Sequence, residues 1–479
     1  MSWQSRVLSD RYADSVRLMG VAARLREREG ITRAEVFMGT PANLAALAEL
    51  GGKADAGPGD LVIALDGADV DGALAEAERL LAAPADHGNG TDAVDPPRSL
   101  GSALGRLSGA NLALVSVPGE YAALEAHRAL SRGLHVLLFS DHVPVADEIA
   151  LKRRAVELGL LVMGPECGTA MLGGVGLGFA NEVPRGPVGI VAAAGTGAQE
   201  AACLVAAHGS GVSHIVGVGG RDLSRDVGGL MFRSAMAALA GDPETETLLL
   251  VSKPPDPETV QALSAELPSD RRVVAAFIGV EGDDLPLEAH GTLEAAAAAA
   301  AGGTPEAVEA LEAQVDAGRE RSAGRRLLGL FTGGTLSHEA ATILRPRLGD
   351  IATEPDAPGH VIADLGDDRY TQGRPHPMVD PTLRRELLAA AAGDGRTGCV
   401  LLDVVCGHAS HPDPAGAIAE EVAAAARGAV VVARVCGTAA DPQDADRQAT
   451  TLREAGALVA PSNAAAARLA GRAVAGAPA

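Results

Sequence analysis

Four glycine-rich turns, each directly after an apolar run, have the residue types and spacing of anion-binding sites. In doubly wound sheets, ligands lie at the carboxyl ends of strands. Glycine there lets the backbone come close, and the next helix points free N–H groups and its positive dipole end at a negative charge. Such turns also occur for packing alone, but four in one chain favour at least one phosphate or carboxylate site. The residues expected to bind the anion are Gly195, Thr196, Gly197, Gly219, Gly220, Gly333, Gly334, Thr335, Gly407, Ala409 and Ser410.

Other reactive side chains lie near these turns or in one unusual loop. Arg221 adds a fixed cation to the turn at 217–222. The polar loop 367–378 combines two cations, a histidine and an aromatic residue, which solvated loops seldom do. Cys167 ends a strand in a polar turn, but no base is adjacent, so a small packed thiol is favoured over a nucleophile. The sequence therefore offers cations and imidazoles but no obvious nucleophile.

Several familiar cofactor motifs are absent. The chain has no complete GxGxxG fingerprint with its acidic partner and no GxxxxGK[ST] P-loop, so neither NAD nor a P-loop nucleotide is predicted. His408 and His411 have HxxH spacing, but they fall in a turn beside Pro412, and no metal site is predicted. The five cysteines are scattered without a CxxC pair, which argues against a zinc ribbon and a disulfide framework.

The turns need a scaffold of parallel strands, and the hydrophobic pattern predicts one. Near-continuous apolar runs alternate with helical patterns, as in parallel sheets covered on both faces. The fold expected is α/β: a small N-terminal α/β lobe, a Rossmann-like domain and two flavodoxin-like domains. The last two look alike, since each has a strand, a Gly-Thr turn and a helix, at 194–200 and 332–339. The expected boundaries are 1–97 for the lobe and its linker, 98–184, 185–300, a helical connector at 301–325, and 326–479.

Composition limits the kinds of partner. The 479 residues carry 40 basic and 62 acidic side chains, a formal net charge of −22, so nucleic acid and anionic membrane surfaces would be repelled. Aromatic residues make up only 2%, too few for base-stacking platforms. No apolar run approaches a membrane span and no signal peptide opens the sequence. We therefore expect a cytoplasmic protein whose ligands are small anions.

Parts of the chain resemble the succinyl-CoA synthetases. The segments that resemble the CoA-binding domain of the α subunit are Pro118–Tyr121, Ser140–Pro144 and Met163–Cys167. The turns at 195–196 and 217–220 resemble its second domain, and residues 326–475 resemble the C-terminal domain of the β subunit. This resemblance implies that CoA is a possible cofactor, near Pro118, Gly164, Pro165, Glu166 and Cys167.

Over nearly all its length the chain resembles the FdrA family of acyl-CoA synthetase-like proteins. The segments typical of that family are Met38–Asn43, Gly220–Arg225, Val251–Pro255, Thr332–Leu336 and Gly373–Met378. The chain departs from the synthetases in two respects. There is no room for an ATP-grasp domain, and only the sequence around His290 approaches their phosphohistidine loop, which it matches poorly.

The FdrA resemblance implies a subunit of an oxamate carbamoyltransferase in purine (allantoin) catabolism. That reaction converts oxalurate and phosphate to oxamate and carbamoyl phosphate, without nucleotide or CoA. The partners implied are phosphate, carbamoyl phosphate or an acyl group, together with other subunits of the complex. In the synthetases two helix N-termini flank the phosphohistidine, and they map here to 195–197 and 406–410. Arg221 and Arg374 would grip carboxylate or phosphate, and His376 or His408 would move a proton.

Two alternatives remain open at this stage. One is a CoA-ligase half-enzyme that borrows an ATP-grasp partner and uses His290. The other is a noncatalytic scaffold subunit whose partner carries the active site.

Overall fold

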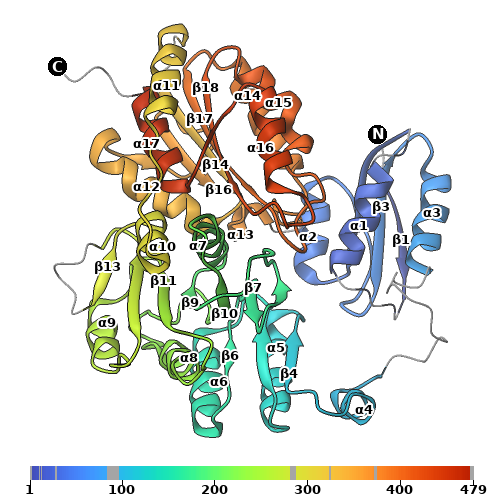
Figure 1. Cartoon of the computed structure of the whole chain (residues 1–479). Helices are drawn as coiled ribbons and strands as arrows, with labels where there is room; N and C mark the ends of the chain where they lie inside the picture. The colour runs from blue at the N-terminus through green and yellow to red at the C-terminus, as the bar shows by residue number, and fades with distance from the viewer. Residues whose placement is uncertain are drawn as a thin grey trace. The chain divides into compact units, whose positions relative to one another are not determined.

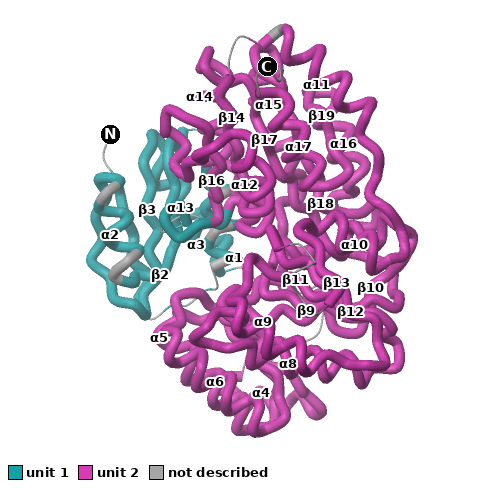
Figure 2. Tube along the Cα trace, turned by 90° about the vertical axis from the view of Figure 1, so that its left-hand side faces the viewer, with its two compact units in different colours: residues 1–96, 367–376 teal, residues 97–366, 377–479 magenta. Residues whose placement is uncertain are grey.

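A computed structural model of the chain describes residues 3–9, 11, 13, 15–26, 28, 30–82, 97–280, 287–322, 325–371 and 375–474. It divides into two compact units, residues 1–96 with 367–376 and residues 97–366 with 377–479 (Figure 2). Within the described residues, no helix is both long and apolar enough to cross a lipid bilayer. Strands in these residues form four sheets.

The first unit is a three-stranded antiparallel sheet with helices. Its elements are β1 (Gln4–Leu8), α1 (Ser15–Arg26), β2 (Ile31–Met38), α2 (Pro41–Glu49), β3 (Leu61–Gly67), α3 (Val70–Ala82) and the short α13 (Asp368–Thr371). β3 lies between β1 and β2 and runs antiparallel to both. Helix α3 buries Val70, Ala73, Leu74, Ala77 and Leu81, the spacing of one apolar helix face.

The second unit contains a seven-stranded sheet with the order β13-β12-β11-β9-β10-β7-β8. Its strands are β7 (Thr169–Leu172), β8 (Val175–Gly178), β9 (Val188–Ala193), β10 (Val212–Gly217), β11 (Thr247–Ser252), β12 (Arg272–Phe277) and β13 (Glu288–His290). The helices of this half are α7 (Gly195–Ala207), α8 (Leu230–Ala240), α9 (Pro257–Ser264) and, after β13, α10 (Leu293–Ala301). From β9 to β13 the strands are parallel, and their order along the sheet is 2-1-3-4-5.

A six-stranded parallel sheet repeats this order. Its strands are β14 (Arg326–Phe331), β15 (Ile351–Ala352), β16 (His360–Asp364), β17 (Thr397–Val405), β18 (Val430–Cys436) and β19 (Leu458–Ala460). Without the short edge strand β15, the order is again 2-1-3-4-5, that of flavodoxin-like folds. Its helices are α11 (Glu309–Arg321), α12 (Gly334–Leu348), α14 (Thr382–Gly393), the 3-10 turn η2 (Gly416–Ile418), α15 (Ala419–Ala425), α16 (Ala445–Glu454) and α17 (Asn463–Val474). The two flavodoxin-like halves are therefore architectural copies, as their matching Gly-Thr turns predict.

A smaller parallel sheet of order β4-β5-β6 completes the second unit. It comprises α4 (Leu100–Arg106), β4 (Leu112–Val115), α5 (Gly119–Leu130), β5 (His135–Leu138), α6 (Val145–Leu158) and β6 (Val162–Met163). Three parallel strands joined by two helices form one mononucleotide-binding half of a Rossmann-like sheet.

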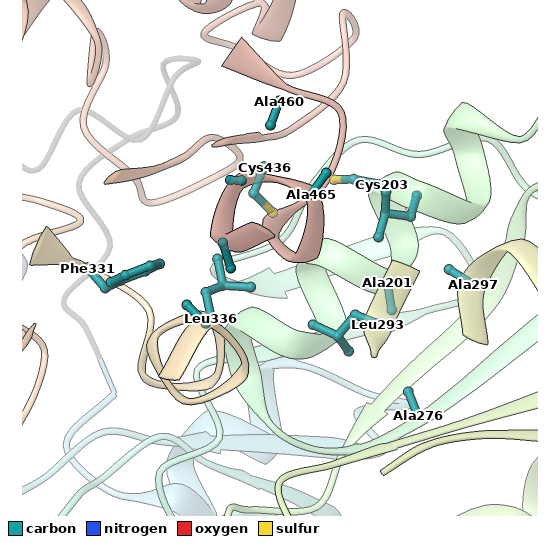
Figure 3. Close-up of a cluster of buried hydrophobic side chains, with 14 of the residues drawn as sticks. Ala201, Cys203, Ala276, Leu293, Ala297, Phe331, Leu336, Cys436, Ala460 and Ala465 are labelled. Atoms are coloured by element: carbon teal, nitrogen blue, oxygen red, sulfur yellow. The ribbon is translucent and has the colours of Figure 1, made fainter. Parts of the chain in front are cut away.

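One apolar core joins the two flavodoxin-like halves. Ala201 and Cys203 of α7 and Leu293 and Ala297 of α10 belong to the same buried cluster as side chains of the six-stranded half, including Leu336. Figure 3 shows these side chains at the meeting of the halves, and Figure 1 shows the sheets themselves, one coloured from teal-green to yellow-green and the other from orange to red. Alanine and leucine fill this core, so the helices approach closely. The α/β fold class predicted from the hydrophobic pattern is confirmed.

Candidate functional site

Helices α7 and α12 meet at their N-termini. Each follows the first strand of its flavodoxin-like half, at the point where the order of the strands reverses and ligands bind in open α/β sheets. A Cβ atom on Gly333 would lie 2.7 Å from Thr196 Oγ1, and one on Gly197 would lie 2.8 Å from Thr335 Cγ2. Glycine at both positions is what allows the two helix tips to touch.

The first N–H groups of both helices are unpaired in the described parts of the chain. Within the described parts of the chain, no acceptor bonds the N–H of Gly195, Thr196 or Gly197, nor that of Gly334 or Thr335. The first turn of a helix has no intrahelical acceptors, and its dipole places partial positive charge there. Two such tips side by side form an environment that stabilises a small anion.

Buried Asp403, near the end of β17, fixes the backbone of the two residues that precede α12. Its carboxylate accepts from Thr332 N at 2.8 Å, Thr332 Oγ1 at 3.1 Å and Gly333 N at 2.9 Å. The buried guanidinium of Arg384 also bonds this carboxylate and donates to Leu330 O at 2.8 Å. Burial lowers the pKa of Arg384 while Asp403 opposes that shift. This ion pair fixes the turn from which α12 starts.

Lys253 supplies the cation of the site. It follows β11, is exposed, and makes no hydrogen bond or ion pair with the described residues. Its Nζ lies 3.6 Å from where a Cβ on Gly334 would be, and Oδ2 of Asp364 lies 2.5 Å from the same point, so a cation and a carboxylate both border this glycine. Burial, followed by the charges of Lys253 and Arg345, lowers the pKa of half-buried His338 on α12. An ammonium group beside two helix N-termini adds a full positive charge to their partial charges.

Sequence reasoning assigned no role to Lys253, Asp364 or Asp403. A usable signal existed for Lys253, because the chain has only three lysines, Lys53, Lys152 and Lys253, and this one directly follows an apolar strand. Its position predicts the same sheet edge as the glycine turns. The contacts of Asp364 and Asp403 with α12 depend on strand order, which the sequence pattern does not specify.

The expectation that the turn at 406–410 opens a helix facing residues 195–197 is wrong. No helix begins there: Gly407 and Ala409 have φ angles of 111° and 63°, and the next helical turn is η2. The N–H groups of Gly407 and His408 bond Gln443 Oε1 and Ala180 O, at 2.9 and 2.8 Å. Nε2 of Gln199 on α7 donates to Asn181 Oδ1 at 3.0 Å and to the Cys406 carbonyl at 3.4 Å. The partner of α7 is α12, and the turn at 406–410 is held by its own backbone and neighbours.

The predicted cation Arg221 is engaged in a buried network. Its Nε donates to Glu148 Oε2 at 2.9 Å and its NH2 to Val143 O at 2.9 Å. Fully buried Lys152 lies between Glu148 and Asp222, with both Nζ–O distances at 2.7 Å. Arg221 therefore joins α6 to the 218–222 loop and is not free to grip a ligand, which corrects its predicted role.

The glycines beside Arg221 serve different purposes. Gly219 has φ 88°, and a Cβ there would lie 2.7 Å from Pro165 O, so this residue permits close packing of two loops. Gly220 is exposed, and a Cβ there would be 4.0 Å from Ala193 O, near the start of α7. Only Gly220 remains close to the helix tips.

Each of the predicted proton carriers has local surroundings of its own. His408 is exposed and pairs with Glu182, its Nε2 lying 2.6 Å from the carboxylate. Burial lowers the pKa of His376 to about 4, which makes its imidazole a weak base near neutral pH. His376 belongs to the first unit, and Arg374 lies outside the described residues. Ser410 Oγ is buried without a partner in the described structure.

The region expected to bind CoA has a poor set of groups for that cofactor. Pro118 precedes α5, and a Cβ on Gly119 would lie 2.3 Å from Asp141 O, so the protein itself occupies this glycine's open side. A Cβ on Gly164 would likewise lie 2.3 Å from Leu138 O. The turns at 116–121, 140–144 and 164–168 carry Glu120, Asp141 and Glu166 but no lysine or arginine. Such a set does not fit the phosphates of CoA, and no step through CoA is derived.

Cys167 is an inert, packed thiol. It is 3% exposed, and its Sγ lies 3.3 Å from Gly217 O and 3.4 Å from Thr169 O. Burial raises the pKa of this thiol to about 12. The thiolate that a nucleophile needs is therefore disfavoured, in agreement with the structural role favoured from the sequence.

Two family models match the chain. One described as "CoA-ligase" matches residues 330–473, and one described as "AllF, heavy metal-associated domain" matches residues 1–96. Residues 1–96 contain no cysteine, so the soft thiolate ligands of heavy-metal sites are missing and no metal role is derived for this unit.

Some known proteins match part of the chain, and one matches nearly all of it. Succinate–CoA ligase [ADP-forming] subunit alpha of Aquifex aeolicus (strain VF5) is 31% identical over 36% of this chain and 58% of its own length. A solved structure, the dinucleotide forming acetyl-coenzyme A synthetase 1 of Ca. Korarchaeum cryptofilum, covers 76% of this chain and 82% of its own, at 14% identity and a TM-score of 0.28. Uncharacterized protein YahF of Escherichia coli (strain K12) is 38% identical over 94% of this chain and 95% of its own length.

Fold and matches together define a class of α/β protein with a CoA-ligase-like region at residues 330–473. Within that class, the chain belongs to the family of YahF.

Proposed function

We propose that the chain is the phosphate-handling subunit of a carbamoyltransferase of the FdrA type, acting in allantoin catabolism. The reaction is phosphorolysis of oxalurate to oxamate and carbamoyl phosphate. The observation that carries the proposal is the contact between the N-termini of α7 and α12, with Lys253 beside them. The AllF-type match over residues 1–96 supports the link to allantoin.

The reaction requires only groups of the kinds found at this site. A phosphate oxygen attacks the ureido carbonyl carbon of oxalurate, and the bond from that carbon to the oxamate nitrogen breaks. The proton of hydrogen phosphate ends on the departing nitrogen, so no net proton is released. Negative charge grows on the carbonyl oxygen in between, where a preorganised N–H donor contributes roughly 3–4 kcal/mol.

Each part of the site has a separate task in this scheme. The N–H groups of α7 and α12 bind phosphate and the developing oxyanion, while Lys253 compensates the phosphate charge. Asp403 and Arg384 keep the α12 tip in place through Thr332 and Gly333. Neither nucleotide nor CoA enters these steps, in keeping with the acidic turns of the Rossmann-like sheet.

The first test is calorimetric titration of the purified chain with carbamoyl phosphate and with phosphate, beside assays of oxalurate phosphorolysis. Activity is measured for the chain alone and with the products of its neighbouring genes. We expect saturable binding that weakens in Lys253→Gln, and turnover in the assembled complex. Binding without turnover in every complex would favour the scaffold role, and absence of binding would refute the proposal.

A second candidate is an acyl-CoA synthetase half-enzyme, which the CoA-ligase match over residues 330–473 favours. That enzyme would carry phosphate on His290, which lies at the end of edge strand β13, its Nε2 3.4 Å from Glu288 Oε1. Incubation with ATP or an acyl phosphate, followed by peptide mass spectrometry, separates the two functions. Phosphate on His290 that is lost in His290→Asn would support the synthetase, and an unmodified His290 supports the carbamoyltransferase.

A further inference from the structure

Beyond its tip, one face of α12 borders the carboxyl edge of the seven-stranded sheet. Lys253 follows β11 and lies beside Gly334 in the first turn of α12. Gly279 follows β12, the parallel neighbour of β11, and a Cβ there would lie 2.8 Å from Thr342 Cγ2, further along α12. The ends of two neighbouring strands therefore follow one side of α12 over about two turns. Ligands of open α/β sheets bind at this edge of the strands.

His338 and Arg345 lie on this same face of α12. An α-helix turns by about 100° per residue, so both residues lie within about 40° of Gly334 around the helix axis. Helical side chains lean toward the N-terminus of their helix, which carries the guanidinium group of Arg345 back toward His338. The charges of Lys253 and Arg345 both act on the imidazole of His338. Lys253, His338 and Arg345 thus form one row of polar groups that starts at the α12 tip.

The two cations of this row have no ion-pair partner in the described parts of the chain. Both Lys253 and Arg345 are exposed, and neither side chain makes a hydrogen bond there. The Asp364 carboxylate borders Gly334, at the end of the row next to Lys253, and lies within 4.0 Å of neither cation's nitrogen atoms. A guanidinium group binds a carboxylate through two parallel hydrogen bonds, so Arg345 is suited to a ligand that carries one.

The imidazole ring of His338 adds an unpaired nitrogen to the row. Its Nε2 is buried and has no hydrogen-bond partner in the described structure, whereas the large majority of buried polar atoms in folded proteins have one. Burial, followed by the charges of Lys253 and Arg345, lowers the pKa of the ring, which is therefore neutral at physiological pH and carries one N–H. A ligand that bonds Nε2 would remove the cost of leaving this atom unpaired.

We propose that Arg345 and His338 bind the carboxylate of the carbamoyl donor while the helix tips bind phosphate. This inference rests on the proposed function and adds substrate specificity to it, since the donor must then be an acyl urea that ends in a carboxylate. Arg345 pairs with the carboxylate, and the N–H of His338 donates to one of its oxygens. His338 lies only about 6 Å along α12 from Gly334, so the two anionic groups would hold the ureido carbon between them.

The test is calorimetric titration of the full chain with oxamate at saturating phosphate, with ethyl oxamate as the ligand that lacks the negative charge. Arg345→Gln and His338→Phe are compared with Arg347→Gln, which removes an exposed arginine about 140° around the same helix. We expect oxamate to bind at least about tenfold more weakly to Arg345→Gln and His338→Phe, with Arg347→Gln unchanged and the ester bound weakly throughout. Circular dichroism checks that each variant is folded, and Arg345→Gln, at an exposed position, carries the test if His338→Phe is not.

Titration with phosphate alone separates this inference from the proposed function. Arg345→Gln should bind phosphate as tightly as the unsubstituted chain, whereas Lys253→Gln should bind it more weakly. A chain that binds phosphate but binds oxamate equally well with and without Arg345, or does not bind oxamate, would overturn the carboxylate subsite and leave the phosphate site in place. A chain that binds no phosphate would refute the proposed function, and this inference with it.

Discussion

Thr196 lies directly against Gly333, close enough that a Cβ on this glycine would be 2.7 Å from the threonine Oγ1 and 2.8 Å from its Cβ. The two residues belong to different flavodoxin-like halves. Their contact brings the first turns of α7 and α12 together and so defines where an anion can bind.

Adding one methyl group at this contact should separate the helix tips. Gly333→Ala places a Cβ within 3 Å of three Thr196 atoms, and such overpacking costs roughly 1–3 kcal/mol. We expect carbamoyl phosphate affinity to fall more than about tenfold, measured by calorimetry. Gly428→Ala is the matched control, because nothing lies within 4 Å of its Cβ position. Equal carbamoyl phosphate affinities in the two variants would show that the Thr196–Gly333 contact is not needed for binding.

The charge of Lys253 should matter for binding more than for folding. The side chain is exposed and has no ion-pair partner in the described structure, so Lys253→Gln should leave the free energy of unfolding within about 0.5 kcal/mol of the original. Phosphate and carbamoyl phosphate should bind roughly tenfold more weakly and with less dependence on salt. Lys253→Arg should restore most of the affinity. Equal anion affinities in Lys253→Gln and Lys253→Arg would show that the positive charge at this position plays no part in binding.

The buried lysine of the Rossmann-like half should be essential for stability. Lys152 is 0% exposed and neutralises Glu148 and Asp222, which are equally buried. Lys152→Met leaves these carboxylates without their shared partner, a change that costs about 3–5 kcal/mol. Urea unfolding measures this loss, with exposed Lys53→Met as control. A loss below about 1 kcal/mol would contradict the network's role.

Glu339 should make stability depend on pH. Burial, with the charges of Glu200 and Glu294, raises the pKa of this carboxyl group to about 7, while hydrogen bonds from Asn463 and Leu293 oppose the shift. The folded state therefore holds a proton that the unfolded chain, with its ordinary pKa near 4.5, releases. Stability contributed by that proton falls as pH rises from about 4.5 to about 7, by at most about 3 kcal/mol.

Glu339→Gln isolates this effect. Urea unfolding of the variant and the original chain between about pH 5 and about pH 8 should give a difference in unfolding free energy that grows in the variant's favour with pH. The comparison is needed because His376, whose pKa is lowered to about 4, contributes the opposite trend between about 4 and 6.5. A difference that stays constant with pH would assign Glu339 an ordinary pKa.

Two of the four predicted glycine turns open helices, whereas no helix starts directly after the turns at 217–222 and 406–410, and the pairing of the helix tips was not predicted. Residues 195–197 and 333–335 follow apolar strands and open helices, as predicted from their pattern. The turn at 406–410 has the same appearance in sequence, yet Gln443 and Ala180 occupy its N–H groups. Those acceptors come from distant parts of the chain, so no local pattern reveals that the N–H groups of the turn are already hydrogen-bonded.

The partners of the charged residues could not be predicted from the sequence either. Arg221 looks like an anion ligand beside a glycine turn, but the side of α6 that faces it carries Glu148. Lys253 lies in the family-typical segment Val251–Pro255, but that segment gives it no role; its importance follows from β11 ending beside the α12 tip.

By itself, the sequence determined the α/β class, the two similar halves and the positions where strands give way to glycine turns, because hydrophobic periodicity and glycine act locally along the chain. Tertiary structure alone decided which helix tips meet and which charges stay free. A shared alanine- and leucine-rich core packs α7 against α12. Buried polar groups must be hydrogen-bonded, so they pair with whichever neighbours the fold places beside them.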